Sequence, residues 1–285
     1  MTLIKRNKVR LLFIVNEILK KIFKIQIYIK DLNSQKKSNL YTLCKNYVDN
    51  YNGENNSDMK TNGEWRFIKH NLRQCKIIFD IGANIGDWTT LALNINNNVN
   101  IHCFEPNYDA FNKLIQKDFP TNVICNNFGL SSIKGEKDLY IFENGSGLNS
   151  LYQRHGLENG WNLKPQQKKE KVKLDTLHNY CNEQNISKID YMKIDVEGHE
   201  LEVFKGGRDL FTNGYVNIIQ FEYGGCNIDS RVLLKDIFEF FKGMDYDFYK
   251  IYPDYTKLSR RYDQRLENFQ HQNWLIIKKG ILFNR

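Results

Sequence analysis

The stretch 76–90, KIIFDIGANIGDWTT, constrains the fold of this chain more than any other part of the sequence. It opens with a run from Ile77 to Ile81 that is apolar except for Asp80, which is typical of a strand buried on both faces of a parallel sheet. Gly82 and Gly86 then allow a sharp turn that brings the backbone close to a ligand. Because a helix-compatible segment follows, the stretch predicts the start of a βαβ nucleotide-binding unit.

Strand-like and helix-like segments alternate from residue 76 onward. This alternation predicts an α/β, Rossmann-like fold with a doubly wound, mostly parallel sheet. The last two predicted strands, 248–252 and 273–278, are expected to form an antiparallel C-terminal pair. A chain of 285 residues fits one such domain, predicted at 64–285, after an N-terminal helical extension and a polar linker at 1–63.

The first 30 residues are basic and apolar. Their apolar side chains recur every three or four positions, which predicts an amphipathic helix that either packs on the domain or rests on a partner or an anionic membrane surface. The longest apolar run there is far shorter than the roughly 20 residues that span a bilayer. The six cysteines are scattered without a CxxC pair, which favours reduced thiols. We therefore expect a cytoplasmic protein, with any membrane contact peripheral and made through residues 1–30.

The glycine turn favours a sulfonium cofactor over a dinucleotide. A dinucleotide fold would have the spacing G-x-G-x-x-G, whereas this turn has G-x-x-x-G. An acid two residues before the first glycine disfavours a pyrophosphate and favours a ligand with a positive amine. S-adenosylmethionine carries such an amine and a sulfonium, and it has no phosphate. The candidate cofactor-binding residues of the turn are Asp80, Gly82, Ala83, Asn84 and Gly86.

Two further candidates for the cofactor site follow the next two predicted strands. Glu105 ends the strand at 100–104, where a carboxylate can accept both hydroxyls of a ribose. A capping or surface role beside Pro106 is the alternative for this acid. Asn127 ends the strand at 123–127 and is a candidate contact for an adenine ring.

The segment 191–200, YMKIDVEGHE, carries the candidate catalytic groups. It ends a predicted strand at the carboxyl edge, where open α/β sheets place their ligands. Asp195, Glu197 and His199 alternate, so an extended backbone would put them on one side, and Glu222 at the end of the next strand could converge on them. Asp195, Glu197 and His199 are candidates for the general base that removes the proton of an acceptor hydroxyl. A divalent metal such as Mg²⁺ could bind Asp195 and Glu222. The alternative is a structural turn followed by a helix start that favours negative charge.

Five segments between residues 77 and 223 together resemble the FkbM family of S-adenosylmethionine-dependent methyltransferases. These are FDIGANIGDWT, CFEPNYDAF, the GLSS turn, VKLDTL and MKIDVEGHELEVFKGG. The resemblance implies a Rossmann-like class I methyltransferase fold and, usually, O-methylation of polyketides, sugars or surface glycans. It puts the turn residues at the cofactor, Glu105 at the ribose, and Asp195 and Glu197 at the methyl-transfer site. His199 stands where a small or varied residue is expected.

We therefore expect an S-adenosylmethionine-dependent O-methyltransferase that acts on a hydroxyl of a sugar, a glycan or a related small acceptor. The methyl would move by direct displacement, for which the enzyme mainly aligns the reacting atoms. The alternatives are an NAD-dependent oxidoreductase, which the missing third glycine disfavours, and a non-catalytic binding protein that retains the fold. The net charge of +8 would suit a nucleic acid, but no nucleic acid is expected because an Asn/Asp-Pro-Pro-Tyr-type motif is missing after the predicted strand 189–194.

Overall fold

The computed structural model describes residues 17–21, 24, 34–142, 147–157 and 168–284, and the chain divides into two compact units, 1–52 and 53–285. The described part of the first unit is chiefly helix α2 (Ser34–Asn52). The sequence predicted a polar linker there, but the segment has neither Gly nor Pro, and Lys45 pairs with Asp49 one turn later at 2.6 Å. The amphipathic helix predicted within residues 1–30 falls almost entirely outside the described residues. No helix in the described ranges is long and apolar enough to cross a membrane.

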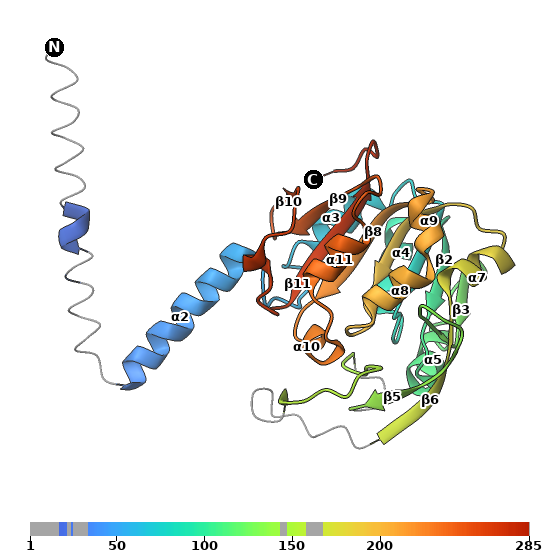
Figure 1. Cartoon of the computed structure of the whole chain (residues 1–285), viewed down its shortest axis with the longest axis horizontal. Helices are drawn as coiled ribbons and strands as arrows, with labels where there is room; N and C mark the ends of the chain where they lie inside the picture. Colours follow the sequence, from blue (N-terminus) through green and yellow to red (C-terminus); the bar gives the residue numbers. More distant parts are fainter. Residues whose placement is uncertain (1–16, 22–23, 25–33, 143–146, 158–167, 285) are drawn as a thin grey trace, which may run out of the picture. The chain divides into compact units, whose positions relative to one another are not determined.

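The second unit is built on an eight-stranded sheet with the order β10-β9-β11-β8-β7-β1-β2-β3 (Figure 1). Its strands are β1 (Ile77–Ile81), β2 (Asn100–Phe104), β3 (Val123–Asn126), β7 (Ile189–Ile194), β8 (Val216–Tyr223), β9 (Tyr246–Ile251), β10 (Thr256–Ser259) and β11 (Gln272–Lys278). Strands β8, β7, β1, β2 and β3 pair with their neighbours in parallel. Strand β11 lies between β8 and β9 and is antiparallel to both. The predicted sheet and its antiparallel C-terminal pair are confirmed. The direction of strand addition changes between β1 and β7, which is where such sheets bind ligands.

Helices cover both faces of this sheet because its strands are apolar on both sides. The helices are α3 (Glu64–Asn71), α4 (Asp87–Ile95), α5 (Tyr108–Ile115), α7 (Leu177–Glu183), α8 (Glu200–Gly206), α9 (Arg208–Thr212), α10 (Cys226–Ser230) and α11 (Leu234–Phe240), with a 3-10 turn at Gln264–Leu266. In β1, Ile78 packs into the core under α3, α4 and α5, and Phe79 packs into the core under α7, α8, α9 and α11. This alternation is the period of two that a strand buried on both faces requires.

Two short helices, α10 and α11, follow β8 and are separated by residues 231–233. Arg231 has a left-handed backbone, with φ of 59°, at the end of α10, and α11 begins only at Leu234. A left-handed residue cannot continue a right-handed helix, so the two short helices meet at a bend.

A smaller sheet with the order β4-β6-β5 stands apart from the large one. It contains β4 (Gly129–Leu130), β5 (Gly135–Ile141) and β6 (Lys168–Asp175), and β5 pairs antiparallel with β6. Four of its buried side chains, Leu139, Ile141, Val172 and Leu174, form an apolar cluster of their own. This separate sheet was not predicted from the sequence. A bridge between Tyr140 and Ser150 ties the segment 147–157 to its edge.

Residues 53–63, predicted to be part of the linker, belong to the second unit. The amide of Asn55 donates to the carbonyl of His271 at 3.0 Å. Gly63 has φ of 100°, and a Cβ there would lie 2.2 Å from the carbonyl oxygen of Tyr252. This close approach fixes the segment on the strands that end the chain, and it places the start of the compact unit at residue 53.

Candidate active site

The glycine turn after β1 touches the loop after β7. Gly82 has φ of 84°, and a Cβ there would lie 1.8 Å from the carbonyl oxygen of Asp195. The amide of Asp195 in turn donates to the carbonyl of Ile81 at 2.9 Å, while the amides of Gly82 and Ala83 donate to Phe104 at 2.9 and 3.0 Å. Only glycine fits at position 82, because both the backbone angle and the contact exclude a side chain. The two loops therefore meet at the point where the sheet changes direction.

Asp80 lies beneath this turn and is fully buried. Its Oδ2 accepts a hydrogen bond from Thr89 Oγ1 at 2.6 Å, and its Oδ1 has no partner among the described residues. Burial raises the pKa of Asp80, and the positive charge of Lys193 opposes that rise. The carboxyl thus joins β1 to α4 and supports the turn from below.

Glu105 faces the turn from the end of β2. Its two carboxyl oxygens each accept one backbone hydrogen bond at 2.8 Å, from Asn84 and from Asn107. Burial raises the pKa of Glu105 to about 7 in spite of these two bonds, because the carboxyl is almost out of contact with water. Asn127 holds the backbone behind it by donating to the carbonyls of Glu105 at 3.0 Å and Pro106 at 3.3 Å.

A first cavity opens between the glycine turn, the end of β2 and the small sheet. Its wall is mainly apolar and includes Phe104, Leu130 and Leu139. Its polar groups are Asn84, Glu105, Asn149, Asp195, Glu197 and His199. The side-chain oxygen of Asn84 is buried and has no partner among the described residues. A buried acceptor without a donor is costly, so this atom fits a ligand that donates to it.

A second cavity of about 430 Å³ lies beside the first and is more polar. The two cavities share a common wall that consists of Gly82, Asn84, Gly147, Asp195 and Glu197. The structure therefore brings the predicted residues Asp195 and Glu197 to the place where the cavities meet.

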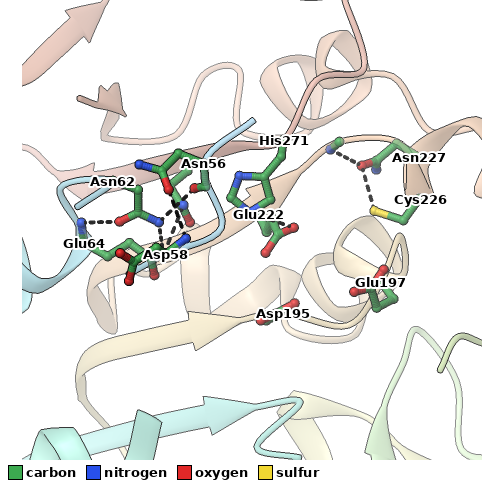
Figure 2. A network of polar contacts seen from close by, with 12 residues as sticks. Asn56, Asp58, Asn62, Glu64, Asp195, Glu197, Glu222, Cys226, Asn227 and His271 are labelled. Atoms are coloured by element: carbon green, nitrogen blue, oxygen red, sulfur yellow. Dashed lines mark hydrogen bonds and ion pairs between the residues drawn. The ribbon is translucent and has the colours of Figure 1, made fainter. Parts of the chain in front are cut away.

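Acids that face this meeting point each pair with a nitrogen of a basic side chain. Figure 2 shows Glu222 beside His271, with Asp195 and Glu197 on the side that the Glu222 carboxylate faces. The carboxylates pair as follows: Asp195 with Lys193 at 2.9 Å, Glu197 with Arg154 at 2.7 Å, and Glu222 with His271 at 3.1 Å. Burial raises the pKa of Glu197 well above its usual value, and the neighbouring charges of Glu222 and Asp195 add to the rise.

These pairings bear on the predicted metal site at Asp195 and Glu222. In the ranges that the structure describes, no group of three or more His, Cys, Asp and Glu side chains could hold a metal ion. Lys193 also lies next to Asp195, where its positive charge would compete with a divalent ion, and His271 already occupies one oxygen of Glu222. Mg²⁺ binding stays a prediction.

His199 is buried and lines the first cavity together with Asp195 and Glu197, but its ring nitrogens contact other protein groups. Its Nδ1 is 2.9 Å from the hydroxyl of Tyr152, and its Nε2 is 2.9 Å from Ser131 Oγ. Burial lowers the pKa of His199 to about 4. The extended backbone assumed from the alternation is wrong here, because Glu197 and Gly198 have φ of 52° and 97° and form a turn. Both nitrogens of the imidazole are therefore engaged within the protein.

Sequence reasoning missed three groups at this site, namely His271, Lys193 and Arg154. Lys193 lies within an apolar strand, and Arg154 lies in a polar segment without a recognisable motif. His271 could have been found from topology, because the first residues of β11 must lie beside the last residues of β8 in an antiparallel pair. The observed register, Asn273 opposite Glu222, puts them there.

Comparisons with known proteins agree with this geometry. The family described as Methyltransferase FkbM domain matches residues 80–248, more than half of the chain. The hexuronic acid methyltransferase AglP of Haloferax volcanii is 27% identical over 200 residues, which cover 70% of this chain and 72% of that protein.

Two solved structures align with this chain at low TM-scores. A methyltransferase FkbM from Methylobacillus flagellatus has a TM-score of 0.44 at 12% identity and covers 70% of this chain, which spans 43% of that structure. A putative caffeoyl-CoA O-methyltransferase from Staphylococcus aureus has a TM-score of 0.40 at 12% identity over 91% of this chain and 99% of that one. The strand order and the family match together confirm the predicted class I methyltransferase fold. This chain therefore belongs to the FkbM family of S-adenosylmethionine-dependent methyltransferases.

Proposed function

We propose that this enzyme methylates a hydroxyl oxygen of a sugar or glycan. The observation that carries the proposal is the shared wall at Asp195 and Glu197, where a mainly apolar cavity meets a polar one. That arrangement suits a nucleoside on one side and a hydroxyl-rich acceptor on the other. The hexuronic acid methyltransferase among the relatives supports a sugar as the acceptor.

The first cavity fits the adenosyl part of the cofactor. Glu105 would accept the ribose hydroxyls, and Phe104, Leu130 and Leu139 would contact the adenine ring. Asn84 has the buried oxygen without a described partner that a donor on the cofactor would satisfy. When bound, S-adenosylmethionine supplies a methyl group on a positively charged sulfur, and the carboxylates around the shared wall favour that charge. The same carboxylates disfavour the pyrophosphate of NAD.

The second cavity fits a hydroxylated acceptor. Its wall carries amide, carboxylate and ammonium groups that can exchange hydrogen bonds with the hydroxyls of an acceptor. These groups belong to Glu64, Lys193, Asp195, Gln220, Glu222 and Asn273. Trp88 adds an aromatic face to the same wall. Holding the acceptor oxygen in line with the methyl group is the main contribution that such a site makes to the rate.

Asp195 and Glu197 are proposed to border the reacting atoms, as predicted from the sequence. His199 is proposed to position the segment 147–157 through Tyr152, since neither of its nitrogens is available to an acceptor in this arrangement. Asp80 and Asn127 are proposed to support the cofactor site from behind. Contact of residues 1–30 with a membrane surface stays a prediction.

Methyl transfer to an oxygen is the expected outcome of an acceptor panel. The full chain would be incubated with S-adenosylmethionine carrying a ¹³C-methyl group and with methyl glycosides of a neutral hexose, a hexuronic acid and a hexosamine. We expect a new ¹³C methyl-ether signal on at least one glycoside, with heat-denatured protein as the control. Transfer to the hexosamine nitrogen alone, or to a transfer RNA added as a competitor, would contradict the proposal.

A further inference from the structure

His271 and Glu222 form a pair at the acceptor side of the site. His271 lies immediately before β11 and Glu222 lies near the end of β8, and Nε2 of the imidazole is 3.1 Å from Oε1 of the carboxylate. Their side chains are 22% and 26% exposed, so both are largely desolvated yet open to a ligand. Both line the second cavity and also a third cavity of about 380 Å³ that continues from it toward Arg154 and Phe269.

The backbone around His271 is held on both sides. Its carbonyl accepts the amide of Asn55 at 3.0 Å, and the next residue, Gln272, is paired with Tyr223 of β8. On the other side, a Cβ on Gly224 would come within 3.2 Å of the Cα of His271. A ring on so constrained a backbone, with one nitrogen bonded to a carboxylate, has little freedom to turn, which is what a catalytic group needs.

The pairing leaves one nitrogen of the ring for chemistry. When Nε2 donates its hydrogen to Glu222, the neutral imidazole carries its lone pair on Nδ1. Among the residues that the structure describes, Nδ1 of His271 has no hydrogen-bond partner. His199 differs, because both of its nitrogens contact protein groups.

We propose that His271 is the general base that removes the proton of the acceptor hydroxyl, and that Glu222 orients its ring and stabilises the imidazolium. The acceptor oxygen forms its bond to the methyl carbon as the carbon–sulfur bond breaks, and the hydroxyl proton passes to Nδ1. One positive charge is present before the step, on the sulfur, and one after it, on the imidazolium, so the step is balanced. This inference rests on the proposed function and names its proton acceptor.

Charged groups around the ring support this assignment. The charged and titratable groups that line the second and third cavities with His271 are Glu64, Asp87, Arg154, His155, Lys193, Asp195, Glu197, Glu222 and Asp229. Lys193 and Arg154 are each paired with another acid, so Glu222 is the partner that governs the ring.

Methyl transfer is expected to fall about 10²- to 10⁴-fold in His271→Gln, the range for loss of a general base. The rate would be measured with the neutral and acidic glycosides of the panel, at saturating S-adenosylmethionine and with EDTA present. The affinity for S-adenosylhomocysteine should stay within threefold of the wild type. His178→Gln is the matched control, since His178 lies on α7 with its side chain 48% exposed. A rate within threefold of the wild type in His271→Gln, or loss of wild-type activity on adding EDTA, would overturn the proposal.

A second measurement needs no acceptor. Nitrogen chemical shifts of ¹⁵N-labelled histidine should show the Nε2–H tautomer for His271 in the wild type. That tautomer is the one that leaves the lone pair on Nδ1, the nitrogen that faces away from Glu222. The Nδ1–H tautomer would refute the assignment, whereas failure of the wild type to bind S-adenosylhomocysteine would count against the proposed function.

Discussion

Gly82→Ala is expected to abolish binding of S-adenosylhomocysteine and to destabilise the second unit. The added methyl would lie 1.8 Å from the carbonyl oxygen of Asp195, so the loops after β1 and β7 would have to separate. That movement displaces the wall that the two cavities share and the hydrogen bond from Asp195 to Ile81. Calorimetric titration and thermal unfolding of the purified variant would measure the two effects.

Gly280→Ala is the matched control for this change. Gly280 also has φ of 84°, but a Cβ there would have no atom within 4 Å among the described residues. It should therefore carry the backbone strain alone, roughly 1–2 kcal/mol, with unchanged cofactor affinity. Equal behaviour of the two variants would show that the contact with Asp195 does not matter.

Glu105→Gln is expected to weaken binding of S-adenosylhomocysteine about 100-fold. The loss corresponds to about 3 kcal/mol, the order expected when two hydrogen bonds to a charged group are weakened. Glu183→Gln on α7 is the control, because it makes the same chemical change far along the chain from the site. An unchanged dissociation constant in a folded Glu105→Gln variant would remove Glu105 from the cofactor site.

The pH dependence of binding gives this prediction a second readout. Burial raises the pKa of Glu105 to about 7, and the ionised carboxylate is the better acceptor for ribose hydroxyls, so affinity should rise between about pH 6 and pH 8. The stability of the free protein should change in the opposite direction. Because the folded-state pKa lies above the ordinary 4.5, the contribution of Glu105 to stability is fully present below pH 4.5 and is lost as the pH rises through about 7. Both trends should disappear in Glu105→Gln.

The fold and the cofactor turn could be predicted because their signals are local. The apolar run of β1 and the glycines at 82 and 86 fix a strand and a turn without reference to distant residues. The place of Glu105 beside the turn could also be predicted, because Glu105 ends a parallel strand and parallel strands end at one edge of the sheet. These predictions agree with the strand order and with the positions of Gly82 and Glu105 in the structure.

The acceptor side could not be predicted to the same degree because it depends on contacts between distant segments. His271 meets Glu222 only through the register of β11 on β8, and Arg154 meets Glu197 across 43 positions of the chain. The alternation of Asp195, Glu197 and His199 misled because Glu197 adopts a left-handed backbone, which a periodic pattern cannot reveal. Helix α2 was not predicted because its polar composition resembles that of a linker, although the segment contains no helix-breaking Gly or Pro.

The turn after β1 is proposed to hold a sulfonium nucleoside and not a dinucleotide. The decisive experiment is calorimetric titration of the full-length wild type with S-adenosylhomocysteine and, separately, with NAD. We expect saturable one-to-one binding of S-adenosylhomocysteine and no saturable heat with NAD. Binding of NAD without binding of S-adenosylhomocysteine would contradict this proposal.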